Sequence, residues 1–268
     1  MVSITGATRV IGLIGTPIVQ VKMPGVMNAY AVEHGIDVVL IPMDVAAASV
    51  PDLMRTVRGW HNLLGIIVTV PFKQVVAGLC DDLTPRARRL TTANVVRRDA
   101  DGRLTGEILD GVGFVDAARA NGFDPDGKAA AVIGAGGVAS AIAHSLCEHG
   151  VRSLRIEDVV TAKRDALVAT LAGALPAVRV EAGIPSVERL DLLVNGTPVG
   201  MNGDPSLPLD QAMLRTLPAG CYVADVVTAP VMTPFLQLAQ SRGCRIQTGI
   251  EMTRPQLMPM ARYLGVIS

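Results

Sequence analysis

A glycine-rich segment at residues 134–139 is the feature with the clearest chemical meaning. Gly134, Gly136 and Ala139 fit the pattern G-x-G-x-x-A, directly after an apolar stretch and before an alanine-rich stretch typical of a helix. In such a turn the first glycine permits the tight bend, the second lets the backbone approach a pyrophosphate, and the small third residue allows close packing of helix on strand. The pattern therefore predicts a dinucleotide-binding turn that also includes Gly137 and Val138, although a purely structural turn can carry the same glycines.

An acidic residue ends the strand predicted next, and it bears on the choice of dinucleotide. Asp158 lies about where a carboxylate accepts hydrogen bonds from the adenosine ribose hydroxyls, and its charge would repel a 2′-phosphate. Val159 and Val160 follow at once, and the cations Lys163 and Arg164 come only a turn later. We therefore expect NAD to be preferred, with NADP possible, while a solvated acid at a strand end would look the same.

Three polar residues of the first half could contact a substrate. Lys73 follows the apolar run 65–70, where Pro71 should end a strand and place the lysine in a loop at the strand's carboxyl end, the usual active-site edge of a parallel sheet. Asn94 lies in a second apolar segment, and Asp110 falls at the junction of the two predicted halves, where clefts commonly bind substrates. On the local pattern alone, Lys73 could equally be a solvated surface charge.

The elements that must position these residues alternate along the first half. Apolar runs predict strands and periodic segments predict helices, and this alternation implies parallel pairing. A hairpin signal, Asp-Ala-Asp-Gly, adds an antiparallel pair. The expected strands are 9–15, 36–41 and 64–70, the helices are 24–35 and 50–60, and the hairpin strands are 93–98 and 103–109.

The second half repeats strand–helix units. Helices are expected at 111–122 and 137–149, an amphipathic segment at 252–264, and strands at 128–134, 153–158, 178–182, 190–197, 222–227 and 244–249. The predicted fold class is therefore α/β with two domains. Residues 1–110, completed by a C-terminal helix at 246–268, should form a mixed-sheet substrate domain, and residues 111–245 a Rossmann NAD(P)-binding domain.

Composition excludes several classes of protein. The chain has 268 residues, 50% of them hydrophobic, and 24 basic residues balance 24 acidic ones. Such a chain is not disordered, and it has no net charge to attract nucleic acid. The chain has no run of ~18 apolar residues, so we expect no membrane span, and no signal peptide is recognised. The four cysteines show no metal-ligand spacing, so we expect reduced thiols, no metal and a cytoplasmic protein.

Seven segments, in the same order, resemble the shikimate/quinate dehydrogenase family. They are Val68–Lys73, Ala93–Val96, Asp110–Phe114, Gly134–Gly137, Asn195–Met201, Asp225–Pro234 and Gly249–Gln256. The resemblance implies hydride transfer between a nicotinamide and a ring secondary alcohol such as shikimate, quinate or a less polar analogue, with a role in aromatic amino acid biosynthesis. The expected partner is thus a small cyclic hydroxy acid or ring alcohol, and a homodimer is possible.

The resemblance also assigns roles to residues. Lys73 and Asp110 match the family's catalytic pair, in which the lysine accepts the proton released when an alcohol is oxidised and the aspartate steadies the protonated lysine. Thr69, Asn94 and Gln256 match positions that hold ring hydroxyls. The implied cofactor positions outside the glycine-rich turn are Asn195, Thr197, Pro198, Met201, Val226, Gly249 and Met252.

The departures from the family pattern concern the substrate. Val21 and Met23 stand where two serines bind the substrate carboxylate, and Thr228 replaces a tyrosine that faces the same group. Ile67 and Leu109 replace polar residues in two other motifs. A buried carboxylate without hydrogen bonds is costly, so we expect either a substrate less polar than shikimate or another anchor, Lys22 or Arg254. The alternatives are a catalytically slow NAD-binding sensor derived from the family and a folate-type dehydrogenase.

Overall fold

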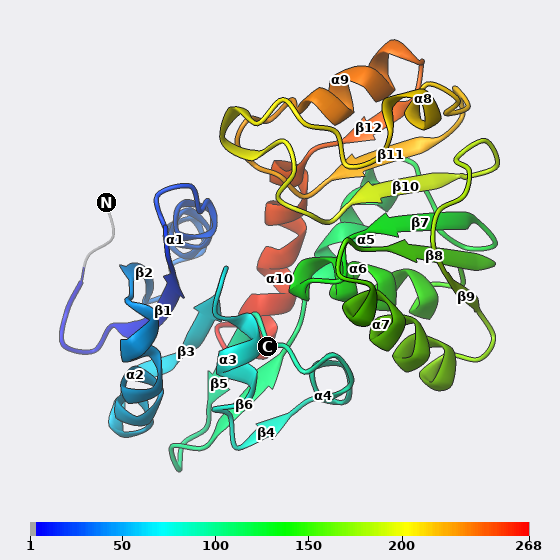
Figure 1. Cartoon of the computed structure of the whole chain (residues 1–268). Helices are drawn as coiled ribbons and strands as arrows, with labels where there is room; N and C mark the ends of the chain where they lie inside the picture. Colours follow the sequence, from blue (N-terminus) through cyan, green and yellow to red (C-terminus); the bar gives the residue numbers. More distant parts are fainter. Residues whose placement is uncertain (1–3, 268) are drawn as a thin grey trace. The chain divides into compact units, whose positions relative to one another are not determined.

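The computed structural model describes residues 4–267, and these fall into two compact units (Figure 1). The first unit contains the chain up to Leu109 and again from Gln256 onward, and the second contains Asp110–Pro255. The boundaries differ slightly from the predicted ones, since Asp110 and residues 246–255 belong to the second unit. The cause at the C-terminal side is β12 (Arg245–Gln247), which pairs with a strand of the second sheet.

The first unit is built on a mixed six-stranded sheet. Its strand order is β2-β1-β3-β5-β6-β4, with β1 parallel to β2 and β3, β4 parallel to β6, and β5 antiparallel to both of its neighbours. The strands are β1 (Arg9–Gly15), β2 (Val38–Asp44), β3 (Leu63–Val68), β4 (Asp82–Leu83), β5 (Val95–Arg98) and β6 (Leu104–Glu107).

Helices cover this sheet on both faces. One face packs against α2 and α3 through a core that includes Ile14, Met54 and Val76. On the other face Gly65 abuts the side chain of Leu264, just after α10, so closely that a Cβ at Gly65 would lie 2.6 Å from its Cδ2. The helices are α1 (Met23–Glu33), α2 (Val50–Thr56), α3 (Lys73–Ala77), α4 (Pro85–Leu90) and, from Gln256 onward, α10 (Thr253–Tyr263), with 3-10 turns at Ala47–Ser49 and Val57–Gly59.

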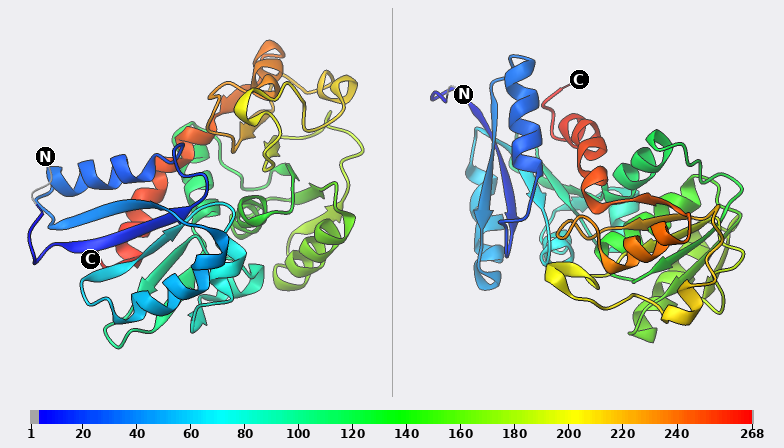
Figure 2. Two further views of the ribbon diagram at one scale, coloured as in Figure 1. Left: turned by 60° about the vertical axis from the view of Figure 1, so that its left-hand side comes forward. Right: turned by 90° about the horizontal axis from the view of Figure 1, so that it is seen from above.

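The second unit has an all-parallel sheet in the order β12-β11-β10-β7-β8-β9 (Figure 1), and Figure 2 shows its ribbon in two further views. Read from β9, this is the order of the dinucleotide-binding doubly wound fold, with its switch point between β7 and β10. The remaining strands are β7 (Ala129–Ile133), β8 (Ser153–Glu157), β9 (Arg179–Ala182), β10 (Leu192–Asn195) and β11 (Tyr222–Asp225). The α/β prediction is thereby confirmed.

Helices lie on both faces of the second sheet as well. One face carries α5, α6 and α7, which contact one another in turn, and the other carries α8 and α9, packed on an apolar core of β7, β10 and β11. These helices are α5 (Asp110–Ala120), α6 (Gly137–Glu148), α7 (Thr161–Ala174), α8 (Gln211–Leu214) and α9 (Pro234–Ser241), with 3-10 turns η3 (Met201–Gly203) and η4 (Gly249–Met252). No helix of the described residues is long and apolar enough to span a bilayer.

One local expectation was wrong. Lys73 does not lie in a loop after the third strand but is the first residue of α3. The strand ends at Val68, and the chain turns into the helix directly after Pro71, with the Val76 N–H donating to the carbonyl of Phe72 at 2.9 Å. Proline is as compatible with the start of a helix as with a loop, so the sequence did not distinguish the two.

Candidate active site

The glycine-rich turn leaves β7 at the switch point of the second sheet. Gly134 adopts φ +107°, a conformation that L side chains rarely adopt, and its N–H donates to the carbonyl of Glu157 at 2.6 Å. Gly136 is the N-cap of α6 in extended conformation, and a Cβ built there would meet nothing within 4 Å. The backbone at this helix N-terminus is therefore open on the side where a pyrophosphate would approach, so the turn fits the predicted group.

Close packing explains why position 139 is alanine and why position 196, to which the sequence pattern assigned no role, is glycine. Ala139 is fully buried in the first turn of α6, and a Cβ at Gly196 would lie 2.6 Å from the Ala139 Cβ. It would also lie 3.0 Å from the Ile133 carbonyl oxygen. Gly196 thus lets the end of β10 approach both β7 and α6. The segment Asn-Gly-Thr-Pro after an apolar strand was the available signal.

Asn195 organises the turn that follows β10. The side chain is fully buried, and its Nδ2 donates to the Val199 carbonyl at 3.1 Å. Its Oδ1 accepts from the Thr197 N–H at 3.1 Å and from the Thr197 hydroxyl at 2.6 Å. Pro198 in the same turn is exposed, and Met201 begins η3 with 40% of its surface exposed. The turn is therefore rigid at its base and presents apolar atoms at its tip.

A buried carboxylate at the end of β11 connects to this turn. Asp225 is 1% exposed, and its Oδ1 accepts from the Asn195 Nδ2 and from the Val227 N–H, both at 3.0 Å. Its Oδ2 accepts from the Thr233 hydroxyl at 2.7 Å. Burial raises the pKa of the Asp225 carboxyl above its usual range, and these hydrogen bonds oppose that shift. In the sequence, an acid within the otherwise apolar segment YVADVV is the feature that indicates such a buried carboxylate.

The remaining predicted cofactor positions lie near β11 and β12. Val226 is half-buried, and a Cβ at Gly249 would lie 2.5 Å from the Val226 carbonyl oxygen and 2.4 Å from that of Val227. Only glycine therefore fits at the start of η4. Met252 ends this turn as a buried side chain, and Thr248 and Glu251 form a capping box in front of it.

Asp158 has a different surrounding from the one expected. Its Oδ2 accepts from the Ala135 N–H at 2.6 Å, and its Oδ1 accepts from the Val160 N–H at 2.7 Å. Both oxygens are therefore engaged by the protein backbone, and the carboxylate holds the glycine-rich turn to the start of α7. This structural role is enough to explain an acid at the end of β8, so the acid does not by itself indicate a ribose contact.

Backbone bonds bring the first unit's polar residues to one edge of its sheet. Lys73 is 8% exposed, and its carbonyl accepts from the Ala93 N–H at 3.0 Å. Asn94 is 1% exposed, its carbonyl accepts from the Val68 N–H at 2.7 Å, and its Oδ1 accepts from the Leu109 N–H at 2.8 Å. Asn94 thereby fixes the backbone N–H of Leu109, the residue directly before Asp110, which is buried and begins α5 in the second unit.

The residues expected to face the substrate lie in segments that follow strands. Thr69 is half-buried beside Gly15, where a Cβ would lie 2.3 Å from the threonine Cγ2. Val21 is half-buried in the loop after β1, and Met23 is buried as the first residue of α1. Gln256 lies on α10 in the first unit and Thr228 after β11 in the second, and both are half-buried. The two possible alternative anchors, Lys22 and Arg254, are exposed.

Comparison with known proteins decides the family. Residues 13–96 match the model of the shikimate dehydrogenase substrate binding domain. A shikimate dehydrogenase (NADP(+)) of Rhodospirillum rubrum is 36% identical over 264 residues, which cover 96% of this chain and 91% of that protein. The chain belongs to the shikimate dehydrogenase family. Membership confirms the resemblance of the seven segments, and the protein is a shikimate dehydrogenase-like oxidoreductase.

Solved structures of the family share the whole fold. Shikimate 5-dehydrogenase from Thermus thermophilus, in complex with NADP(H) and shikimate, superposes with a TM-score of 0.85 at 27% identity, over 97% of this chain and 94% of that one. A 5-ketofructose reductase of a Gluconobacter strain gives a TM-score of 0.85 at 26% identity, over 96% of this chain and 92% of that one. The family fold therefore occurs in proteins named for different substrates.

The expected preference for NAD was wrong. The relative from Rhodospirillum rubrum is named for NADP(+), as are those from Paramagnetospirillum magneticum and Dinoroseobacter shibae, and the Thermus structure holds NADP(H). The physical reason lies in Asp158, because the carboxylate taken as a ribose ligand binds the backbone N–H groups of Ala135 and Val160. An acid at this position is thus no guide to the dinucleotide.

Proposed function

We propose that this chain reduces a ketone to a secondary alcohol with NADPH, and catalyses the reverse reaction with NADP⁺, on a polyhydroxylated substrate that lacks a carboxylate. The observation that carries the proposal is the pair Val21 and Met23, which offer no side-chain donors where the family pattern has serine hydroxyls. Removing two donors would leave a bound carboxylate uncompensated, whereas hydroxyl and carbonyl groups are far cheaper to bury. The structural likeness to a 5-ketofructose reductase supports a substrate of this kind.

The roles of the chain's residues follow from the needs of the reaction. Reduction delivers a hydride to the carbonyl carbon and requires a proton at its oxygen, and oxidation reverses both transfers. The dinucleotide, when bound, supplies the hydride. Lys73 is assigned the proton exchange with the substrate oxygen, and Asp110 is assigned the stabilisation of the protonated lysine. Asn94, Thr69 and Gln256 are assigned the neighbouring hydroxyls, and we place substrate binding in the first unit and dinucleotide binding in the second.

We further propose NADP(H) as the cofactor. Gly134, Gly136 and the N-terminus of α6 would hold the pyrophosphate. With Asp158 engaged by the backbone, the exposed ammonium of Lys163 in the first turn of α7 is the cation best placed in sequence for a 2′-phosphate. The free cysteines of the described chain are consistent with a cytoplasmic location, which we also propose.

A substrate panel tests the proposal. Shikimate and quinate would be assayed with NADP⁺ and NAD⁺, and 5-ketofructose and other uncarboxylated polyhydroxy ketones with NADPH and NADH. We expect kcat/KM for the best uncarboxylated substrate to exceed that for shikimate by at least about tenfold, a difference of about 1.4 kcal/mol. Shikimate turnover above about 10⁴ M⁻¹s⁻¹ would overturn the substrate assignment. Absence of turnover with every compound, despite NADPH binding, would favour the sensor instead.

A further inference from the structure

One buried carboxylate joins three separate segments of the second unit. Asp225 accepts hydrogen bonds from Asn195 at the end of β10, from the Val227 N–H after β11, and from Thr233 at the start of α9. Thr233 is itself fully buried, and its hydroxyl also caps α9 by accepting from the Leu236 N–H at 3.3 Å. A single side chain therefore fixes the ends of two strands relative to the helix that follows them.

The same bonds control two loops. Asn195, held by Asp225, orders Thr197 and Val199 through its own side chain. The two loops also touch directly, because the Asn202 N–H donates to the carbonyl of Ala229 at 3.0 Å. Gly200 packs against Thr233, where a Cβ would lie 3.3 Å from the threonine Cβ. Residues 195–203 and 226–233 consequently form one connected piece, which we call the paired loops.

We propose that Asp225 is a positioning residue for hydride transfer, whose carboxylate sets the place of the paired loops against the nicotinamide end of the bound dinucleotide. The paired loops follow β10 and β11, across the switch point from β7 and β8, and in this fold that half of the sheet receives the nicotinamide half of a dinucleotide. The proposal rests on the proposed function, since it needs a dinucleotide at the switch point of the second sheet. A carboxylate suits the task because one group can accept from three donors at once, which no neutral side chain of this size does. Such a fully satisfied buried group gives the loops one defined arrangement.

The pyrophosphate end of the site is built differently. It depends on Gly134, Gly136 and the N-terminus of α6, whereas Asp225 accepts its hydrogen bonds from residues that follow β10 and β11. Loss of the Asp225 carboxylate should therefore loosen the nicotinamide side of the site and leave overall affinity for the dinucleotide nearly unchanged. This separation distinguishes positioning from a general loss of structure.

Three variants and a control test the proposal in the full chain. Asp225→Ala removes all the acceptors, Asp225→Asn retains one oxygen, and Thr233→Val removes a single hydroxyl and serves if Asp225→Ala does not fold. Asp191→Asn is the matched control, because Asp191 precedes the same strand β10 at its opposite end and its Oδ2 accepts the Ala129 N–H at 2.8 Å. The measurements are hydrogen exchange of residues 195–203 without ligand, the affinity for NADPH, the fluorescence lifetime of bound NADPH, and kcat on the best substrate of the panel.

We expect Asp225→Ala, or Thr233→Val in its place, to speed exchange in the paired loops, shorten the lifetime of bound NADPH, and lower kcat by about 10–100-fold, the order of loss that a small misplacement causes. NADPH affinity should change less than about threefold, Asp225→Asn should recover part of kcat, and Asp191→Asn should change neither lifetime nor kcat. Unchanged lifetime and kcat in a folded variant would overturn the proposal, as would an equal effect of Asp191→Asn. If the unmodified chain binds no NADPH, the proposed function fails first.

Discussion

At the scale of single residues, Lys73 carries the strongest expectation for catalysis. Lys73→Ala should lower kcat by about 10²–10⁴-fold, the usual worth of a positioned acid or base. The affinity for NADPH should stay within about twofold, because the glycine-rich turn lies in the other unit. Steady-state kinetics and NADPH titration measure the two effects. Lys128→Ala, just before β7, is the control, and a Lys73→Ala variant as active as this control would refute the assignment.

Substrate choice is also decided by single residues. Val21→Ser combined with Met23→Ser should restore two hydrogen bonds to a carboxylate, worth about 1.5–3 kcal/mol each before non-additivity. We therefore expect kcat/KM for shikimate to rise by at least about tenfold, with full recovery limited by Ile67, Leu109 and Thr228. Val19→Ser is the control, since Val19 lies in the same loop with 91% of its surface exposed. A gain equal to that of the control would show that the carboxylate binds elsewhere.

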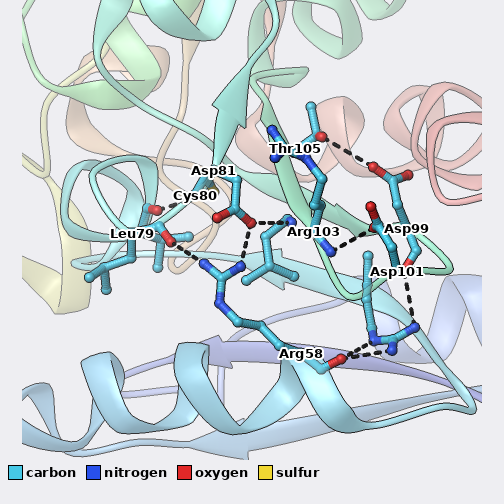
Figure 3. Close-up of polar contacts among 11 residues, drawn as sticks. Arg58, Leu79, Cys80, Asp81, Asp99, Asp101, Arg103 and Thr105 are labelled. Atoms are coloured by element: carbon cyan, nitrogen blue, oxygen red, sulfur yellow. Dashed lines mark hydrogen bonds and ion pairs between the residues drawn. The ribbon is translucent and has the colours of Figure 1, made fainter.

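At the scale of elements, a charged network ties the first unit's hairpin to the end of α2 (Figure 3). Asp81, just before β4, is paired with Arg58 of the turn after α2 and also accepts the Leu104 N–H of β6 at 2.7 Å. The carbonyl of Arg58 in turn accepts from the Arg98 guanidinium of β5 at 2.7 and 2.9 Å. The network therefore fixes the loop before β4, both hairpin strands and the end of α2 together.

This network predicts a pH-dependent stability. The hydrogen bond from Arg58, helped by the Leu104 N–H, lowers the pKa of Asp81 below its usual value. A group whose folded pKa is depressed contributes stability above its unfolded pKa, about 3.9, and loses it as the pH falls through the lower folded value. Asp81→Asn should thus lower Tm by about 2–4 °C at pH 7, for a partly exposed pair worth about 1 kcal/mol. The difference from the unmodified protein should shrink below about pH 4.

The matched control for Asp81 is Asp52→Asn. Asp52 pairs with Arg55 at 2.6 Å, but about three-quarters of each side chain is exposed, so the pair should contribute almost nothing. Thermal unfolding of both variants at pH 7 and pH 3 measures the effect. Equal Tm losses in the two variants, or a loss from Asp81→Asn that persists at pH 3, would contradict the role of the network.

The elements also show what sequence can and cannot provide. The first strand was predicted with its observed bounds, Arg9–Gly15, because a buried strand is a continuous apolar run between turn signals. The glycine-rich turn was equally readable, since its geometry requires glycine. The roles of Asp158 and Asp225 could not be predicted from the sequence. Whether a carboxylate faces a ligand or the backbone depends on segments that meet only in the fold. The prediction that Lys73 lies in a loop was wrong because proline precedes helices and loops alike.

At the scale of the whole molecule, dinucleotide binding should be visible as stabilisation. A ligand that binds only the folded chain stabilises it by RT ln(1 + [L]/Kd). If NADPH binds about tenfold more tightly than NADH, the two should differ by about 1.4 kcal/mol when both are in large excess, or about 3–6 °C in Tm for a chain of this size. Differential scanning fluorimetry with each dinucleotide at the same concentration makes the comparison without any substrate.

Three variants test whether the difference in Tm between NADPH and NADH comes from the 2′-phosphate. Lys163→Ala should remove most of the advantage of NADPH and leave the effect of NADH unchanged, because only NADPH carries the extra phosphate, and Lys128→Ala should alter neither. Asp158→Ala should weaken both dinucleotides alike, since its carboxylate holds the turn beside the pyrophosphate site through the Ala135 N–H. A variant Asp158→Ala that lost affinity for NADH alone would instead mean that this carboxylate binds a ribose after all. Equal stabilisation of the unmodified chain by NADH and NADPH would remove the basis for assigning NADP(H).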